Sequence, residues 1–305
     1  MSRVTSVIPA GFASTNDSFR TWGSSISDMI TASGCNKTSD TGQIDWVTVL
    51  KPVTTNTIAG YEIRKITNST LGDLYVRIDY KTLGASNGNN ATLQVTVGTG
   101  TDGAGAITEI IFPEINCLGA NSITLRNDTT PYPSYCYYDS GTLLISLCPN
   151  KSDPYYSDLL VITRTNDADG AYNGKALMQI TESGSTYTNI KFSYWSSSFG
   201  LVKNSLHVPS NLCYPYAASV PSIEYDGKGA VCVIEHMTPE LNWHKGIVVL
   251  NAADASLGAV VSADVFGASH SYLSLGTSYK GVEASANNSP TTVATGALAF
   301  LWDES

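Results

Sequence analysis

Charged side chains are scarce in this sequence. Only 14% of its 305 residues are Asp, Glu, Lys or Arg, against about a quarter in an average soluble protein. Ser (36), Thr (32) and Asn (20) are abundant instead, so hydroxyl and amide groups keep the surface hydrated. The formal charge of −9 does not favour nucleic acid or anionic membrane as a partner, because phosphate groups are bound by basic faces.

Long apolar runs are also missing. No stretch approaches the roughly 18 apolar residues of a membrane helix. Residues 1–15 hold one Arg and no sustained apolar core, which is unlike a secretory signal. We therefore expect a protein with neither a membrane nor a nucleic-acid partner.

The six cysteines form no CxxC pair, which excludes zinc-ribbon and thioredoxin-like sites. We predict that most of them are buried thiols that pack as small hydrophobic groups. Oxidation after release from a reducing cytosol is the alternative, so their disulfide state stays open. They are Cys35, Cys117, Cys136, Cys148, Cys213 and Cys232.

Recognisable catalytic or metal-binding patterns are absent. The four histidines accompany no GxSxG or HExxH motif, so we predict no catalytic residue, no metal and no cofactor. The segment from Asp167 to Asn173 has calcium-loop character, but position twelve of such a loop is Met178; we interpret it as a hairpin turn. Glu224, Asp226 and Glu235 could form the acid pair of a glycoside hydrolase, a remote alternative.

One helix is predicted, over Asp17–Ser33, because a single amphipathic stripe has a spacing of three to four residues. Asn16, Asp17 or Ser18 can cap its start, and Gly34 can end it. The stripe has to be buried, against a sheet of its own chain or against a neighbouring subunit. Its members are Phe19, Trp22, Ile26, Met29 and Ile30.

Most other segments alternate apolar and polar residues, which is typical of strands with one hydrated face. We therefore predict a mainly β protein of β-sandwich or jelly-roll-like domains. Prolines near residue 150 suggest a boundary, giving an N-terminal arm and helix (1–35), a β-sandwich domain (36–150) and a second β-rich domain (151–305). The predicted strands are Ile44–Leu50, Ile63–Thr67, Leu74–Tyr80, Leu93–Val97, Ile107–Phe112, Ile123–Arg126, Leu143–Cys148, Leu159–Thr163, Ala176–Thr181, Asn189–Tyr194, Ala230–His236, Gly246–Asn251, Leu257–Phe266 and Ala297–Trp302.

Aromatic side chains supply the candidate binding residues. Tyr155 with Tyr156, and Tyr194 with Trp195, could stack on a sugar or contact another subunit. The residues before Asn16 show no strand pattern, so we expect this arm to dock on a neighbouring copy. The candidates for that oligomer contact are Phe12, Phe19 and Trp22.

Several motifs follow one another in the first third of the chain. They are SFRTWGSSISDMITASG (18–34), TSDTGQIDW (38–46), GYEIRKI (60–66), DLYVRIDYKTLGA (73–85) and TLQVTVGTGTDGAG (92–105). In this order they resemble the N-terminal region of virion structural proteins of tailed bacteriophages, over about residues 15–107. The resemblance implies a component of the virion.

We therefore expect a non-enzymatic structural protein of a phage particle, associated with the tail, baseplate or fibre and assembled in the host cytoplasm. Its partners would be copies of itself and other virion proteins, since a neutral polar surface packs without like-charge repulsion. Alternatives are a capsid decoration or collar protein, and a module that binds host-surface carbohydrate or another receptor.

Overall fold

The protein is mainly β, and every strand pair among the described residues is antiparallel. The computed structural model describes residues 2–8, 15–54, 56–83, 90–117, 131–147, 158–167, 171–183, 188–198, 200–204, 223–225, 229–236, 242–251, 258–265, 268–274, 279–284 and 290–303.

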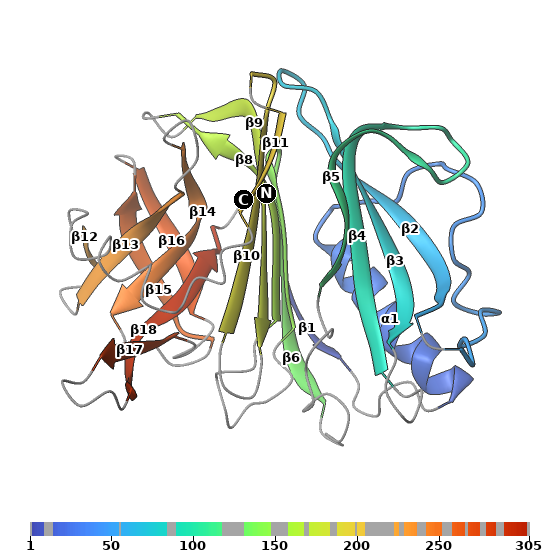
Figure 1. Cartoon of the computed structure of the whole chain (residues 1–305), viewed down its shortest axis with the longest axis horizontal. Coiled ribbons are helices and arrows are strands. Elements are labelled where there is room, and N and C mark those ends of the chain that lie inside the picture. The colour runs from blue at the N-terminus through green and yellow to red at the C-terminus, as the bar shows by residue number, and fades with distance from the viewer. Residues whose placement is uncertain are drawn as a thin grey trace.

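Three layers are stacked side by side (Figure 1). The middle layer, here named the central strands, contains β1 (Ser2–Ile8), β6 (Tyr132–Tyr138), β7 (Thr142–Leu147), β8 (Asp158–Asn166), β9 (Tyr172–Ser183), β10 (Thr188–Ser196) and β11 (Gly200–Asn204), in this spatial order. Consecutive strands from β6 to β11 are neighbours, and β1 is added at the β6 edge.

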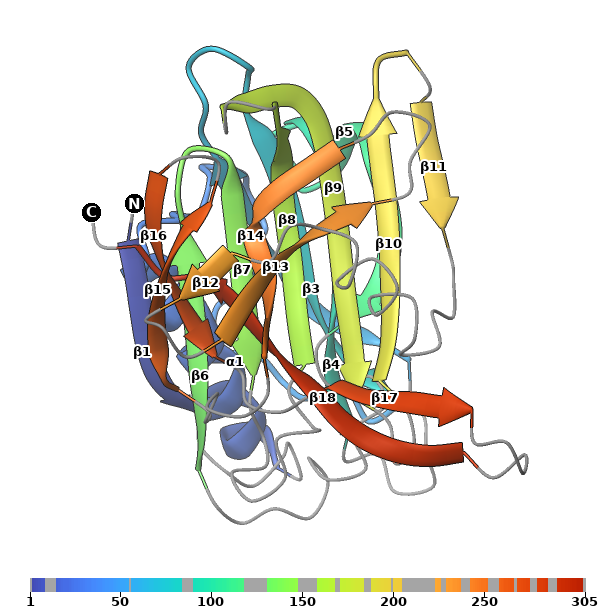
Figure 2. The same ribbon diagram turned by 90° about the vertical axis from the view of Figure 1, so that its left-hand side faces the viewer.

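On one side of the central strands lies a four-stranded sheet in chain order. It consists of β2 (Ile58–Ile66), β3 (Leu74–Leu83), β4 (Asn90–Thr101) and β5 (Ile107–Cys117). Helix α1 (Asn16–Ala32) completes this layer. In Figure 2, α1 lies behind β1 and β6, while β3 and β4 lie behind β8 to β10.

The C-terminal strands form the third layer, on the opposite face (Figure 1). They continue the middle layer through β14, whose Trp243 pairs with Asn166 of β8. The termini lie side by side in both views, and Arg3 Nη1 donates to the carbonyl of Trp302 at 2.7 Å. This layer contains β12 (Ile223–Tyr225), β13 (Gly229–His236), β14 (Asn242–Asn251), β15 (Val260–Val265), β16 (Ala268–Ser274), β17 (Tyr279–Ala284) and β18 (Pro290–Leu301).

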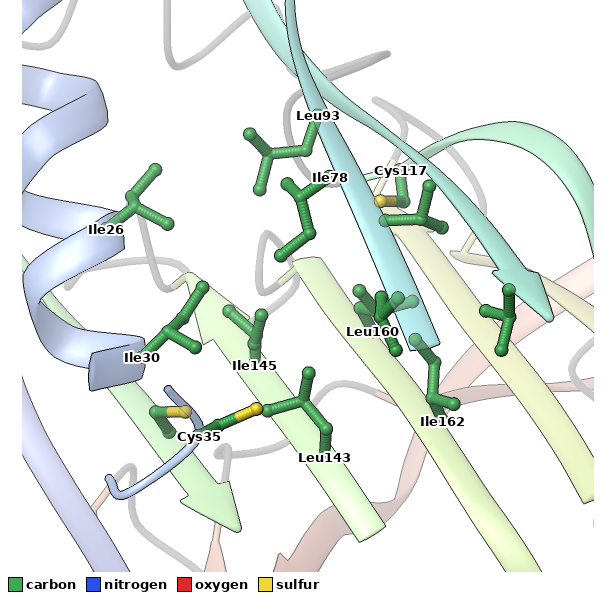
Figure 3. Close-up of a cluster of buried hydrophobic side chains, with 14 of the residues drawn as sticks. Ile26, Ile30, Cys35, Ile78, Leu93, Cys117, Leu143, Ile145, Leu160 and Ile162 are labelled. Carbon is green, nitrogen blue, oxygen red and sulfur yellow. The ribbon is translucent and has the colours of Figure 1, made fainter. Parts of the chain in front are cut away.

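The main core lies between the central strands and the layer of α1 and the four-stranded sheet. Figure 3 shows Ile26 and Ile30 of α1 beside Ile145 of β7, with Ile78 and Leu93 approaching from the four-stranded sheet. Alternation along each strand sends one set of side chains into this core. The opposite set includes Tyr135, whose ring packs against Phe300 of β18 and against Trp302, the residue that follows β18.

The predicted helix is confirmed to within one residue at each end. Its N-cap is Thr15, one residue earlier than the expected candidates: Thr15 Oγ1 accepts from the Ser18 backbone, and Ser18 Oγ accepts from the Thr15 backbone, a capping box. Gly34, at φ 90°, follows the C-cap as predicted.

Two predictions about strands are wrong. Residues 44–50 form a turn, because the Asp45 carboxylate accepts from the Val47 backbone at 2.9 Å and from Thr48 Oγ1 at 2.7 Å. The arm before Asn16, expected to lack strand structure, contains β1. The predicted strand Ile123–Arg126 lies outside the described residues.

The predicted boundary near residue 150 does not separate two sheets. Strands β7 and β8, on either side of it, pair directly from Thr142–Thr163 to Leu147–Asp158. Core residues of β7, β8 and β9 pack in one cluster with those of α1, β3 and β4. A proline-containing connection between neighbouring strands has the same local signature as a linker, so sequence alone could not distinguish them.

Candidate interaction surface

One surface loop exposes an unusual amount of apolar side chain. In residues 45–54, here named the apolar loop, Val47 is 79% exposed, Leu50 65% and Val53 97%. Ile58, at the start of β2, adds a fourth exposed side chain. These are half of the large exposed hydrophobic residues in the described part of the chain. Clustered exposed aliphatic groups mark sites of interaction more than scattered ones do.

Hydrogen bonds hold this loop in a defined shape. The Asp45 side chain closes its first turn, and the Val49 backbone donates to the Asp45 carbonyl at 2.9 Å. Hydrogen bonds from Thr48 and from the Val47 backbone also hold the pKa of Asp45 below its usual range. At the far end, Thr82 Oγ1 of β3 donates to the Thr54 carbonyl at 2.8 Å.

Helix α1 anchors the middle of the apolar loop. Arg20 Nε donates to the Val49 carbonyl at 2.7 Å, and Asn16 Oδ1 accepts from the Lys51 backbone at 2.9 Å. Asn16 and Arg20 are one helical turn apart, so they reach neighbouring parts of the loop from the same side. The apolar side chains are therefore presented on a rigid backbone.

Trp46 is half-buried and packs against the core, unlike these exposed residues. Its ring packs edge-on against Tyr80 with centroids 4.6 Å apart and lies 6.1 Å from the ring of Phe19. Its indole Nε1 donates to Glu62 Oε1 at 3.0 Å. Trp46 and the half-buried Val49 thus anchor a loop in which Val47, Leu50 and Val53 face solvent.

Beneath Trp46 lies a buried charge cluster. The side chains of Glu62 and Arg64 are fully buried, and Glu62 Oε2 is 2.6 Å from Arg64 Nη2. Lys37 Nζ lies 2.7 Å from Glu62 Oε1, to which Ser27 Oγ also donates at 2.6 Å. Burial raises the pKa of Glu62, but Arg64 and the hydrogen bonds from Lys37 and Ser27 outweigh it and hold the pKa below its usual range.

This charge cluster ties the helix to the edge of the four-stranded sheet. Arg64 Nη1 donates to Thr31 Oγ1 at 2.8 Å and to the Cys35 carbonyl at 2.9 Å, and Nη2 donates to the Ser27 carbonyl at 3.1 Å. The hydrogen-bond partners of Arg64 come from α1, from the residues that follow it and from Glu62. The cluster supports the surface above it.

The motifs noted in the sequence converge on this substructure. Gln43 of DTGQI accepts from the Ile63 backbone at 2.9 Å. The glycine-rich turn after β4 packs onto Tyr61, whose hydroxyl donates to the carbonyls of Thr41 and Ala104. Gly105, at φ 109°, has no space for a Cβ, which would lie 2.1 Å from the Tyr61 oxygen. This turn therefore depends on glycine at position 105.

The candidate oligomer contacts are placed differently from our expectation. Phe19 is 0% exposed and Trp22 2%. Both pack in the core of their own chain, which corrects the prediction that they contact a neighbouring copy. Phe12 lies outside the described residues. The residues that are exposed, Val47 and its neighbours, were expected to form a strand.

The candidate sugar-binding aromatic residues do not form a common surface among the described residues. Tyr155 and Tyr156 lie outside the described residues, and of Tyr194 only the backbone is described, paired with Leu177 and Val202. Trp195 is half-buried and packs against the main core. The structure thus brings none of these residues together at a described surface.

The candidate acid pair is also spread out. Glu224 of β12 pairs with Ala230, whereas Glu235 lies five residues further along β13 and pairs with Trp243. The backbones at these two positions are therefore about 16 Å apart along the strand. Asp226 lies outside the described residues.

Other titratable groups are paired within the fold. His270 Nδ1 lies 2.5 Å from Asp303 Oδ2, and the Ser271 backbone donates to Asp303 Oδ1 at 2.6 Å. Within the described ranges, no group of three or more His, Cys, Asp or Glu side chains could hold a metal ion. No described helix combines the length and apolar character of a membrane span.

The side chains of three of the six cysteines are described, and all three are buried free thiols, which agrees with the prediction for these three: Cys35, Cys117 and Cys136. Cys136 Sγ donates to Ser33 Oγ at 3.3 Å. Burial raises the pKa of Cys35 and of Cys136 to about 12. These thiols are therefore protonated at neutral pH and act as core residues.

No family model matches this chain, no curated protein matches it, and no solved structure matches it.

Proposed function

We propose that this chain is a non-enzymatic structural component of a tailed-phage particle, associated with the tail, baseplate or fibre. The observation that carries the proposal is the apolar loop. Its exposed Val47, Leu50 and Val53 lie on a backbone held by α1 and β3. A rigid apolar surface loses little conformational freedom on binding, so it suits a permanent contact with another protein.

The sequence resemblance supports the same proposal. Its motifs span residues 18–105, and they contain most of the helix, Trp46, which anchors the apolar loop, and the glycine turn. The polar surface, with 14% charged residues, suits close packing among identical or different subunits. Free buried thiols suit assembly in a reducing cytosol.

Purified particles provide the direct test. Mass spectrometry should find this chain in the particle, and electron microscopy of gold-labelled particles should place it at the tail, baseplate or fibre. Label on the capsid surface or at the neck would favour the decoration or collar role instead. Absence of the chain from intact particles would overturn the proposal.

The apolar loop can be tested separately. The variant Val47→Ser/Leu50→Ser/Val53→Ser should fold normally, because exposed substitutions change stability by about 0.5 kcal/mol or less each, but should be incorporated into particles poorly. Val260→Ser is the matched control, since Val260 is 50% exposed on β15 in the opposite layer. Equal incorporation of both variants would show that the apolar loop is not the contact.

A further inference from the structure

Seven of the described strands are sheet edges, because each pairs with a neighbour on one side only. An edge strand presents unpaired N–H and C=O groups to which another strand can bind, and proteins protect such edges with charges, proline, bulges or covering segments. The seven edges are β1, β2, β5, β11, β12, β15 and β17.

The edge of β2 is covered by the chain itself. The Thr38 backbone donates to the Ile63 carbonyl at 2.9 Å, and the Ile44 backbone donates to the Tyr61 carbonyl at 2.8 Å. Gln43 accepts from the Ile63 backbone. Residues 37–44 therefore occupy the hydrogen-bonding positions that another strand would need.

The other protected edges carry residues that oppose strand addition. In β5, Pro113 lacks an N–H, Glu109 has a positive φ of 48°, and the register shifts twice. The remaining four edges each contain charged residues, namely Lys203 in β11, Glu224 in β12, Asp264 in β15, and Lys280 and Glu283 in β17.

Strand β1 differs from all of these. Its sequence, SRVTSVI, has no Lys, Asp, Glu or Pro. Its only charge belongs to Arg3, which is held on its own chain: Nη1 donates to the Trp302 carbonyl, and the guanidinium carbon lies 5.6 Å from the Trp302 ring centroid. The ladder with β6 runs through seven residues without a register shift.

The outer edge of β1 is also accessible. In Figure 2, β1 is the outermost of the central strands, and no described strand lies beyond it. Thr5 is exposed and Val7 is 59% exposed. Among the described residues, β1 is thus a regular edge of seven residues without the protection that the other edges have.

We propose that β1 pairs antiparallel with β1 of a second copy, about a two-fold axis at Thr5. A two-fold contact needs only one surface, used twice, so a single unprotected edge is sufficient. The register then places the two Thr5 residues opposite each other and Arg3 of each copy opposite Val7 of the other. Since four residues separate Arg3 from Val7, the two Arg3 residues lie about 13 Å apart along the strands, and no like charges face each other.

A second copy is the partner that these observations favour. A strand with an acidic or basic sequence would find no free charge on this edge to pair with, because Arg3 is held by Trp302. The same segment does match itself, since Thr–Thr cross-strand pairs are favourable. The inference rests on the part of the proposed function in which the chain assembles with copies of itself. It does not depend on where the chain lies in a virion.

Cross-linking of the purified full chain tests the register. In Thr5→Cys, diamide as oxidant should join two copies through residue 5, with the disulfide located by mass spectrometry. Ser262→Cys, exposed on the edge strand β15, should give much less covalent dimer. The unaltered chain, treated alike, accounts for cross-links through its native cysteines.

Sedimentation tests the strength of the contact. The unaltered chain should form dimers at micromolar concentration, and Thr5→Lys should weaken dimerisation at least tenfold because two ammonium groups then face each other. Thr5→Ser should dimerise like the unaltered chain. An unchanged thermal melt of Thr5→Lys shows that its monomer is intact. If this variant misfolds, the presence or absence of the Thr5→Cys cross-link tests the proposed contact instead.

Two results would overturn this inference. One is a chain that stays monomeric at all accessible concentrations and gives no cross-link through residue 5. The other is a dimer that Thr5→Lys leaves unchanged. Neither result contradicts the virion proposal if the chain is still found in particles. Conversely, a β1 dimer formed by a chain that is absent from particles would contradict only the virion proposal.

Discussion

The indole ring of Trp46 lies directly on the backbone of Gly23. A Cβ at position 23 would be 2.0 Å from Cη2 and 2.3 Å from Cζ3 of that ring, much closer than atoms in contact can be. No side chain therefore fits at Gly23 while Trp46 keeps its place. This pair joins the helix to the apolar loop and explains a glycine in the middle of a helix, where glycine is otherwise unfavourable.

Gly23→Ala should destabilise the protein. Helix propensity alone would stabilise by about 1 kcal/mol, but the added methyl group displaces Trp46 from Phe19, Tyr80 and Glu62, and overpacking of this kind costs about 1–3 kcal/mol. Urea unfolding followed by circular dichroism measures the difference. Thr21→Ala, at an exposed helix position, is the control and should change stability by about 0.5 kcal/mol or less. An increase in stability for Gly23→Ala would contradict the contact.

Glu62→Gln should be strongly destabilising. It leaves Arg64 buried without its carboxylate partner, and loss of one member of a buried pair costs about 3–5 kcal/mol. The free energy of unfolding at neutral pH checks this. If the variant is as stable as the unaltered chain, the cluster does not hold the helix on β2.

The same carboxylate should make the fold sensitive to acid. The folded pKa of Glu62 lies below its usual range, whereas the unfolded value is about 4.3. Its contribution to stability is therefore complete above the unfolded pKa and is lost as the pH falls through the folded pKa. Unfolding free energies measured from pH 7 downward should decline less steeply for Glu62→Gln than for the unaltered chain.

Asp79→Asn is the matched control for that experiment. Burial raises the pKa of Asp79, and the hydrogen bond from Arg77 only partly offsets it. A raised folded pKa has the opposite sign: the contribution is complete below the unfolded pKa and is lost as the pH rises through the folded one. The unfolding free energy of Asp79→Asn should therefore still decline as the pH falls below 7. If it declines less steeply in this variant too, Glu62 is not the cause of the acid sensitivity.

The buried thiols should resist alkylation in the native state. The pKa of about 12 for Cys35 and Cys136 leaves almost no thiolate at pH 8, and thiolate is the reactive form. Iodoacetamide should label both residues slowly in buffer and rapidly in urea, as peptide mapping can show. Equal rates in the two conditions would mean that this core opens readily.

Local patterns in the sequence predict much of this fold. Period-two alternation identifies β3, β4 and β9, and the stripe from Phe19 to Ile30 identifies the helix, because each element buries one face. The turn at Asp45 was mistaken for a strand, since a Val-Leu pattern hides the side-chain hydrogen bonds that bend the chain. An Asp three residues before Thr48 was the available signal.

Long-range pairing is what local patterns cannot supply. Strand β1 has a weak alternating pattern of apolar residues, and its pairing with β6, about 130 residues further along the chain, gives it strand structure. The pairing of β7 with β8 likewise makes one sheet of two predicted domains. The apolar loop could not be predicted either, because exposure depends on which segments the rest of the fold leaves uncovered.

Removal of β1 should weaken the isolated chain, in contrast to an arm that only docks on a neighbour. Deleting residues 2–8 removes the ladder with β6, the packing of Val4 on the core and the Arg3–Trp302 contact. The ladder holds about six to eight backbone hydrogen bonds, each with a net contribution of about 0.5–1.5 kcal/mol, so we expect a loss of about 3 kcal/mol or more in unfolding free energy. Thr5→Ala, which keeps the strand, should change it little.

The measurement has to be made on monomer, at concentrations where sedimentation shows no association, so that lost self-assembly does not lower the apparent stability. A deletion variant with unchanged unfolding free energy would mean that β1 contributes nothing to its own chain. The strand would then be available for exchange between copies, and Thr5→Cys cross-links would join β1 to β6 of a neighbour rather than to a second β1.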